Sequence, residues 1–184
     1  LGTIRILEVA RALGIAPVVV VSTDEVTGDR DGIGPASGRS AMRPSSPYSA
    51  SKASAELLAH AYRRSYGIDA RAVRPANCYG PYQHPEKLIP RCITSVLSDR
   101  AAPLYGDGEH ARDWLHVNDA ATGIVAALDA PPEGGAGSPG CVYLLTARDV
   151  RQNREVVQEI VGAMGGRIER VADRPGHDRR YASD

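Results

Sequence analysis

Lysine is almost absent from this chain, although basic residues are not. Of 22 lysine and arginine side chains in 184 residues, only Lys52 and Lys87 are lysines. Acidic residues also number 22, so the formal net charge is zero. Proteins that bind nucleic acid or an anionic membrane surface normally present a basic face, and this neutral balance gives no reason to expect either partner.

Cysteines and long apolar runs are also scarce. Cys78, Cys92 and Cys141 are odd in number and far apart, so they indicate neither a disulfide framework nor a zinc motif. This cysteine usage favours a reducing compartment, the cytoplasm. No apolar run approaches the ~20 residues of a membrane span. Residues 1–5 lack the charged and apolar regions of a signal peptide.

Helix-like and strand-like segments alternate, which predicts an α/β layer fold with a mainly parallel sheet. Gly14 and Gly67 are placed as stops after the first two helices. A short strand is expected at 69–74, although the charged Arg71 weakens that prediction. The expected helices are 3–13, 48–66, 89–97 and 154–164. A further helix is expected to carry Ile124, Val125 and Leu128 and to have its N-cap at Asn118 or Asp119. The expected strands are 17–21, 69–74, 114–117, 141–145 and short ones near Leu104 and Ile168. Loops are expected at 27–47, 75–85 and 131–140, and residues 173–184 show no period.

A tyrosine and a lysine stand four residues apart near the start of the second helix. This spacing puts the Tyr48 phenol and the Lys52 ammonium on one helix face, about a turn apart. A nearby cation favours the phenolate, so we expect the pKa of Tyr48 to be lowered toward the range of a general base. Taken alone, the same spacing is also typical of an ordinary solvated helix face.

Ser22, Thr23, Asp24 and Glu25 directly follow the first strand. Side chains just past the carboxyl ends of parallel strands line the crevice where α/β folds bind ligands. Two adjacent carboxyl groups can divide acid and base roles there if their environments push their pKa values apart. A capped turn with solvated acids is the alternative interpretation.

Longer motifs extend beyond these two segments. Residues 20–26 read Val-Val-Ser-Thr-Asp-Glu-Val, and residues 44–52 read Pro-Ser-Ser-Pro-Tyr-Ser-Ala-Ser-Lys. Further on stand Tyr-Gly-Pro-Tyr at 79–82, Glu-Lys-Leu-Ile-Pro at 86–90, Arg-Asp-Trp-Leu-His-Val at 112–117 and Arg-Pro-Gly-His-Asp-Arg-Arg-Tyr at 174–181. Together they resemble the nucleotide-sugar 4,6-dehydratases of the extended short-chain dehydrogenase/reductase superfamily. The resemblance covers essentially the whole chain. It implies a partial Rossmann-like, doubly wound parallel sheet with a smaller α/β substrate-binding part.

The resemblance also implies a reaction. A nucleotide-diphospho-glucose, dTDP-glucose above all, would lose water and become the 4-keto-6-deoxy sugar nucleotide, with NAD as cofactor. Tyr48, assisted by Lys52, would take the proton of the 4-hydroxyl. Glu25 would remove the C5 proton, Asp24 would protonate the departing 6-hydroxyl, and Thr23 would hydrogen-bond the 4-oxygen.

The binding residues follow from the same resemblance. The implied cofactor ligands are Ser22, Tyr48, Lys52 and Asn77. The implied substrate ligands are Asn77, Lys87, Tyr105, Arg112, Arg174 and His177. Guanidinium forks suit an anionic diphosphate, which fits the two arginines. No metal is implied, and a homodimer is expected because the family forms one.

The resemblance divides the chain into two parts. The C-terminal portion of the NAD-binding Rossmann domain corresponds to residues 1–81, and the chain returns to this domain at 111–130. The substrate-binding part corresponds to residues 82–110 and 131–184. The family opens with a strand, a glycine-rich turn and a helix that hold the pyrophosphate. The glycine-rich segment 32–38 follows no strand and leads to no helix, so we reject it as that turn. A chain truncated at both ends and inactive alone is therefore expected.

Three positions depart from the family pattern. Thr27 stands in place of a tyrosine, Cys78 ends a segment that commonly reads Ser-Asn-Asn, and Leu144 replaces a substrate-binding asparagine.

Two alternatives remain open at this point. The chain could belong to another sugar-nucleotide epimerase or decarboxylase of the superfamily, or it could be an inactive truncated remnant.

Overall fold

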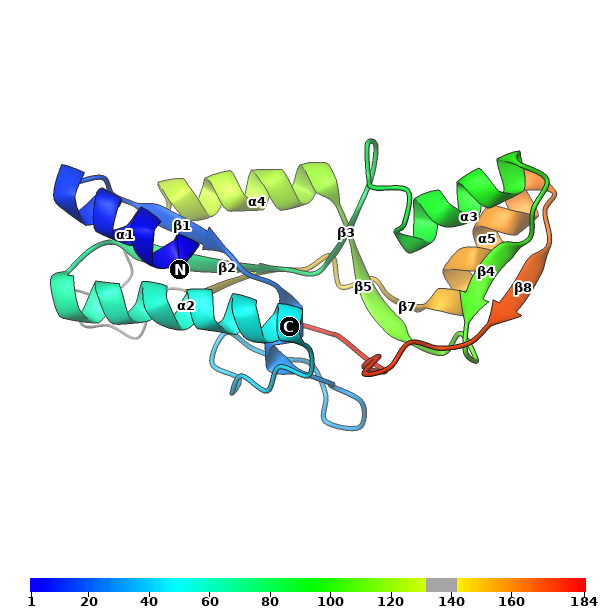
Figure 1. The fold of residues 1–184 in the computed structure, drawn as a ribbon, viewed down its shortest axis with the longest axis horizontal. Coiled ribbons are helices and arrows are strands. Elements are labelled where there is room, and N and C mark those ends of the chain that lie inside the picture. Colours follow the sequence, from blue (N-terminus) through cyan, green and yellow to red (C-terminus); the bar gives the residue numbers. More distant parts are fainter. Residues whose placement is uncertain (132–141) are drawn as a thin grey trace.

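A parallel sheet occupies one half of the molecule. The structure is a computed structural model that describes residues 1–131 and 142–184. The sheet consists of β1 (Val18–Val21), β2 (Ala70–Pro75) and β6 (Val142–Leu145), in the order β1-β2-β6. Helix α2 (Pro47–Tyr66) lies on one side of it and α4 (Val117–Asp129) on the other, while α1 (Gly2–Leu13) packs against α2 (Figure 1). The predicted α/β fold with parallel strands is confirmed.

Local signals explain where these helices begin and end. Ser46 caps α2 and forms a capping box with Ser49. Pro47 takes the first helical position, where a backbone N–H would have no partner within the helix, so proline loses no hydrogen bond there. Gly14 and Gly67 end α1 and α2 with φ of 65° and 71°, a left-handed conformation that only glycine adopts without strain. Both predicted stops are confirmed.

The other half of the molecule contains two strands and two helices. Strand β4 (Ala102–Tyr105) pairs in parallel with β8 (Ile168–Val171), and α3 (Leu88–Leu97) and α5 (Asn153–Met164) pack on them. The core between them is apolar and separate from that of the first half; its buried members are Cys92, Ala102, Leu104, Val157 and Val161.

A third small sheet lies between the halves (Figure 1). Strand β3 (Asn77–Tyr79) pairs in parallel with β5 (Ala111–His116), which pairs antiparallel with β7 (Val150–Gln152). The C-terminal segment returns across the molecule, because Arg180 bridges to Ala111 and Ser183 bridges to Ala36. The edge where β1 ends is thereby brought close to the second half. There the chain turns into a short 3-10 helix, η1 (Asp24–Thr27).

Several expectations need correction. Strand β3 lies inside the segment 75–85, which was expected to be a loop, and β7 was not expected at all; each has only three residues, too few to show a period. Helix α4 is capped by His116, whose Nδ1 accepts from the backbone N–H of Asn118, and not by Asn118 or Asp119. The predicted linker 131–140 falls, from 132 onward, outside the described residues, as does Cys141.

Arg71 does not weaken strand β2. Its guanidinium is buried and donates to the carbonyl oxygens of Ala127 and Ala130 at 2.7 Å, so it satisfies the C-terminal end of α4. It also pairs with Asp69. A charged residue in this central strand is tolerated because its donors reach the orphan carbonyls of a neighbouring helix.

The division into two functional parts stays a prediction. We propose it with one change: Val142–Leu145 belongs with the first part, because β6 is hydrogen-bonded to β2. Within the described residues, no helix combines the length and the apolar composition that crossing a membrane requires.

Candidate active site

The segment that follows β1 places two carboxyl groups next to each other. Thr23 caps η1: its Oγ1 accepts from the backbone N–H of Glu25 at 3.4 Å and donates to Asp24 Oδ1 at 3.2 Å. Asp24 is buried, and its Oδ2 has no hydrogen-bond partner among the described residues. Glu25 is only partly buried and reaches the cavity described below. One strand end therefore presents a shielded acid and an accessible one.

Their surroundings differ in a way that separates their roles. Burial, with a contribution from Glu25, raises the pKa of Asp24 to about 7. Burial also raises the pKa of Glu25, and the negative charge of Asp178 adds to that shift, while the positive charges of Arg112, Arg174 and Lys87 oppose it. At neutral pH Asp24 can therefore keep a proton, while the three cations limit the rise in the pKa of Glu25.

Tyr48 and Lys52 share one face of α2, as the spacing predicts. The Lys52 ammonium lies 5.9 Å from the centre of the Tyr48 ring and donates to the carbonyl oxygen of Val21 at 3.0 Å. Tyr48 is 52% exposed, and its ring borders the cavity beside Glu25. The end of β1 and the start of α2 thus meet at one place.

The expected lowering of the Tyr48 pKa is wrong for this structure. Burial and the negative charge of Glu25 raise the pKa of Tyr48, and a contact with the Thr23 side chain opposes them only in part. Lys52 does not offset these effects because its ammonium is directed at a main-chain carbonyl rather than at the phenol. A further positive charge is needed before Tyr48 can act as a base near neutral pH.

A cavity of about 650 Å³ collects most of the expected residues from both halves of the molecule. Eight of them line it: Glu25, Tyr48, Asn77, Lys87, Tyr105, Arg112, Arg174 and His177. Ser22, Thr23, Asp24 and Lys52 lie outside its lining. The first three are buried behind Glu25, at the end of β1.

Several polar atoms at or near this cavity have no hydrogen-bond partner among the described residues. Asn77, on β3, lines the cavity and has a buried side-chain oxygen that makes no hydrogen bond, and the same holds for the buried hydroxyl of Ser22. Buried polar groups are normally satisfied. Asn77 lines the cavity, so a bound molecule with a matching donor would satisfy its oxygen.

The expected substrate-binding residues of the second half make different contacts with their neighbours. Lys87 precedes α3 and is exposed, 3.5 Å from Glu86. Tyr105 ends β4, and its hydroxyl accepts from Arg91 at 2.6 Å. The guanidinium of Arg174 lies over the Tyr105 ring at 5.7 Å. A cationic side chain held on an aromatic ring at a cavity wall is well placed to meet an anion.

Arg112 is less free than its expected role suggests. Its guanidinium donates to the carbonyl oxygens of Ala111, Asp178 and Arg179, at 2.8 to 3.2 Å, and lies 4.4 Å from the centre of the Tyr181 ring. It therefore anchors the C-terminal segment against β5. Its function as a phosphate fork stays a prediction.

His177 belongs to a small polar cluster. Its Nδ1 lies 2.8 Å from Asp173 Oδ1, and its ring stacks on that of His110 with 3.7 Å between the centres. Burial is the main cause that lowers the pKa of both histidines. The Nε2 atom of His177 has no partner.

Other cavity residues escaped the sequence analysis. They include Ser46, Cys78, Gln83, Trp114, Asn153, Asp178 and Tyr181. Asp178 and Tyr181 stand inside a motif that was recognised, and the Tyr181 hydroxyl donates to Asp178 at 2.6 Å, but the motif alone gave them no role. Asn153 starts α5 and has a buried, unpartnered side-chain oxygen, a feature that only the fold reveals.

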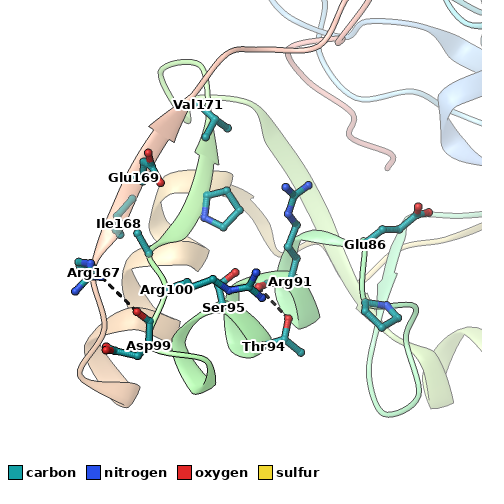
Figure 2. Close-up of a pocket in the computed structure, with 13 residues that line it drawn as sticks. Glu86, Arg91, Thr94, Ser95, Asp99, Arg100, Arg167, Ile168, Glu169 and Val171 are labelled. Carbon is teal, nitrogen blue, oxygen red and sulfur yellow. Dashed lines mark hydrogen bonds between the residues drawn. The ribbon is translucent and has the colours of Figure 1, made fainter.

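A second and larger cleft, of about 980 Å³, lies against α3, β4 and β8 (Figure 2). Arg91, Arg100 and Arg167 line it together with Glu86 and Glu169. Arg167 donates to the carbonyl oxygen of Asp99. None of the residues expected to function in binding or catalysis lines this cleft, so the smaller cavity is the candidate site.

Comparison with known proteins identifies the family of the chain. Residues 1–143 match the model of a family described as "NAD dependent epimerase/dehydratase family". The chain belongs to this family. Within it, the chain is 47% identical over 186 residues to dTDP-glucose 4,6-dehydratase of Streptomyces griseus, with 100% of this chain and 55% of that protein covered.

Solved structures of this epimerase/dehydratase family share the fold. The dTDP-glucose 4,6-dehydratase of Streptomyces venezuelae, crystallised with NAD and a second ligand, is 44% identical with a TM-score of 0.91; the match covers 100% of this chain and 56% of that one. UDP-glucose 4-epimerase of Thermus thermophilus, in complex with NAD, is 28% identical with a TM-score of 0.88 and coverages of 100% and 60%. The chain thus spans little more than half the length of the relatives it matches.

Proposed function

We propose that this chain forms the greater part of the active site of an NAD-dependent sugar-nucleotide 4,6-dehydratase, with dTDP-glucose as the substrate. The observation that carries the proposal is the strand end where a buried Asp24, whose pKa is raised to about 7, adjoins a more exposed Glu25 beside Tyr48. The higher identity to dehydratases than to the epimerase supports the same choice.

The first task of the site is to oxidise the sugar at C4. Tyr48 lines the cavity and would take the proton of the 4-hydroxyl. Lys52 holds its ammonium near the phenol, and Thr23, at the same strand end, would hydrogen-bond the 4-oxygen. NAD⁺, if bound beside Ser22, Lys52 and Asn77, would supply the hydride acceptor for C4 and the hydride donor for C6, and its positive charge would favour the phenolate form of Tyr48.

The second task is to eliminate water. A ketone at C4 acidifies the neighbouring C5–H bond, so the carboxylate of Glu25 would remove that proton and would return it to C5 when hydride adds to C6. Asp24 would donate its proton to the 6-hydroxyl, which departs as water. The reaction needs one protonated and one ionised carboxyl group side by side, and such an acid and base each contribute about 10²–10⁴-fold to the rate.

The residues around the strand end fit the nicotinamide part of NAD. Ser22 and Asn77 offer buried, unpartnered oxygens, and Lys52 offers an ammonium between Val21 and Tyr48. We propose that these groups hold the nicotinamide and its ribose. Among the described residues, the glycines of 32–38 lie between η1 and α2 and provide no strand–turn–helix unit for the pyrophosphate.

Other residues of the cavity lining suit the nucleotide, and Asn77 is shared with the cofactor. Arg174 and Lys87 supply positive charge for a diphosphate, and Tyr105, Asn77 and His177 supply an aromatic face and polar groups. The nucleotide base, a homodimeric assembly and a cytoplasmic location stay predictions.

A chimera provides the test. Residues 1–184 replace the matching portion of the Streptomyces griseus relative, of which they cover 55%. The product formed from dTDP-glucose is then identified by mass and NMR. We expect the 4-keto-6-deoxy sugar nucleotide, with loss of one water. A C4 epimer would instead indicate an epimerase, and a folded chimera without any product would support an inactive remnant.

A further inference from the structure

Gln83, in the connection between β3 and α3, has a half-satisfied side-chain amide. Its Nε2 donates to the carbonyl oxygen of Cys78 at 2.8 Å. Because only the amide nitrogen can donate to a carbonyl, this contact identifies the other atom as the oxygen. That oxygen, Oε1, is buried and has no hydrogen-bond partner among the described residues, although Gln83 lines the cavity. The cavity wall therefore holds an uncharged acceptor that lacks a donor.

The connection that carries Gln83 is held in place by close contacts. Gly80 has a φ of 148°, and a Cβ atom there would lie 2.6 Å from Cγ1 of Val117, so the turn packs directly on the start of α4. The backbone N–H of Gln83 donates to the Gly80 carbonyl at 3.3 Å. Together with the side-chain bond to Cys78, these contacts order Gln83 before a ligand arrives, which lowers the entropic cost of binding.

The chemistry of Oε1 restricts its partner. An amide oxygen accepts hydrogen bonds from O–H or N–H groups, whereas the oxygens of a diphosphate are acceptors themselves and cannot satisfy it. A buried acceptor without a donor costs free energy, so a ligand that supplies the donor is favoured. In a sugar nucleotide, the hydroxyl groups of the hexose are matching donors.

The surroundings of Gln83 indicate which hydroxyls are available to it. Its partner Cys78 lines the same cavity and lies near the proposed acid, because the negative charge of Asp24 adds to burial in raising the pKa of the Cys78 thiol. In the proposed mechanism Tyr48 takes the proton of the 4-hydroxyl, and Asp24 protonates the 6-hydroxyl. The diphosphate occupies C1, so the 2-hydroxyl and the 3-hydroxyl remain.

We propose that Gln83 accepts a hydrogen bond from the 2- or the 3-hydroxyl of the hexose and makes the site specific for a sugar that carries it. This inference rests on the proposed sugar-nucleotide substrate. It assigns to Gln83 the recognition of a hydroxyl that takes no part in the reaction, so the residue contributes to affinity and selectivity rather than to proton transfer.

The test removes one hydroxyl from the ligand and one acceptor from the protein. Binding of dTDP-glucose and of its 2-deoxy and 3-deoxy sugar analogues is measured by calorimetry, with NAD⁺ present, on the chimera carrying Tyr48→Phe to prevent turnover. This parent should bind dTDP-glucose at least about tenfold more tightly than one of the two analogues. After Gln83→Met, the affinities for that pair should be equal. A general loss of order in the connection would instead weaken all three ligands alike.

Further variants separate the acceptor from the contact with Cys78. Gln83→Glu keeps an acceptor oxygen and should retain the preference for the sugar with the hydroxyl. Gln83→Asn, which withdraws the oxygen by one carbon, replaces Gln83→Met if that variant does not fold. The control is Gln158→Met, at an exposed glutamine of α5, which should leave all affinities unchanged.

Three results would overturn the proposal. They are equal binding of the three sugars by the parent, an unchanged preference after Gln83→Met, and a loss of affinity confined to NAD⁺, which would make the cofactor the donor. None of them concerns the dehydration itself, which is judged by the product of the chimera with Tyr48 intact. A different product, with a hydroxyl preference that depends on Gln83, would refute the dehydratase and leave this assignment standing.

Discussion

The guanidinium of Arg74 donates two hydrogen bonds to the carboxylate of Glu56 and so joins β2 to α2. The Nε–Oε2 distance is 3.0 Å, and both side chains are buried. Glu56 follows Lys52 by four residues, as Lys52 follows Tyr48, so all three lie along one face of α2. The ion pair therefore sets the position of the helix that carries the proposed base.

Removing one partner of this pair should be costly. We expect Glu56→Gln to destabilise the chimera by about 3–5 kcal/mol, because it leaves a buried guanidinium without its counter-charge. Replacing both residues, as Glu56→Met with Arg74→Leu, should recover most of the loss. Denaturant unfolding measures both. Glu159→Gln, at an exposed ion pair with Arg151, is the control and should cost less than about 1 kcal/mol. Similar losses in Glu56→Gln and the control would contradict this account.

The strand-end acids should act after oxidation and not before it. In the chimera, Asp24→Asn and Glu25→Gln should each slow formation of the 4-keto-6-deoxy product by about 10²–10⁴-fold. Proton removal by Tyr48 should survive, so reduced cofactor should accumulate on adding substrate and be visible by absorbance. If either variant turns over at the parent rate, the acid and base assignments are wrong.

Asp24 should also make both rate and stability depend on pH. As an acid with a pKa of about 7, it loses its catalytic proton above that pH, so dehydration should decline on the alkaline side. Its folded pKa is raised, so the native state binds more protons than the unfolded state between about pH 4 and 7, and stability falls as pH rises through that range. Asp24→Asn should therefore raise the melting temperature at pH 8 more than at pH 4. An equal shift at both values would show that Asp24 titrates normally.

Lys52 should not tolerate arginine. Its ammonium reaches the Val21 carbonyl at 3.0 Å beside Tyr48, a position that a planar fork cannot take. We expect Lys52→Arg to lower kcat of the chimera by about 10²-fold. Arg64→Lys, exposed on the same helix, is the matched control; Arg63 is unsuitable because it is buried and paired with Asp69 at 2.8 Å. Equal activity of the two variants would contradict a specific role for the lysine.

The chain alone should not hold NAD. Its described residues offer groups for the nicotinamide end but no unit for the pyrophosphate, and β1 is paired on one side only. Calorimetry of the isolated chain should therefore show no saturation at millimolar NAD⁺, whereas the chimera should bind. The isolated chain should also melt less cooperatively than the chimera. A saturable signal at micromolar NAD⁺ would show that the cofactor site is already complete.

Features that rest on local signals could be predicted from the sequence. Gly14 and Gly67 end their helices because glycine adopts the left-handed conformation, and the spacing of Tyr48 and Lys52 fixes a shared face. The spacing could not predict the raised pKa of Tyr48, because burial and Glu25 act through the fold. The three-residue strands are too short to show a period.

The largest omissions concern residues whose partners are distant in the chain. Arg71 looks unsuited to a buried strand until the end of α4 is seen to accept its hydrogen bonds. His110 has no recognisable motif, and only the fold brings it to Asp173 and His177. In each case the deciding contact spans more than fifty residues, a relationship that no local pattern encodes.

The candidate site draws its proposed acid and bases from the half built on β1 and α2, and most of its proposed nucleotide ligands from the half built on α3 and β4. Each half has its own apolar core. Substitutions in separately packed regions act almost independently. Evolution can therefore exchange the sugar nucleotide that is recognised while preserving the acid–base machinery, so one scaffold can diversify its substrates without reinventing its chemistry.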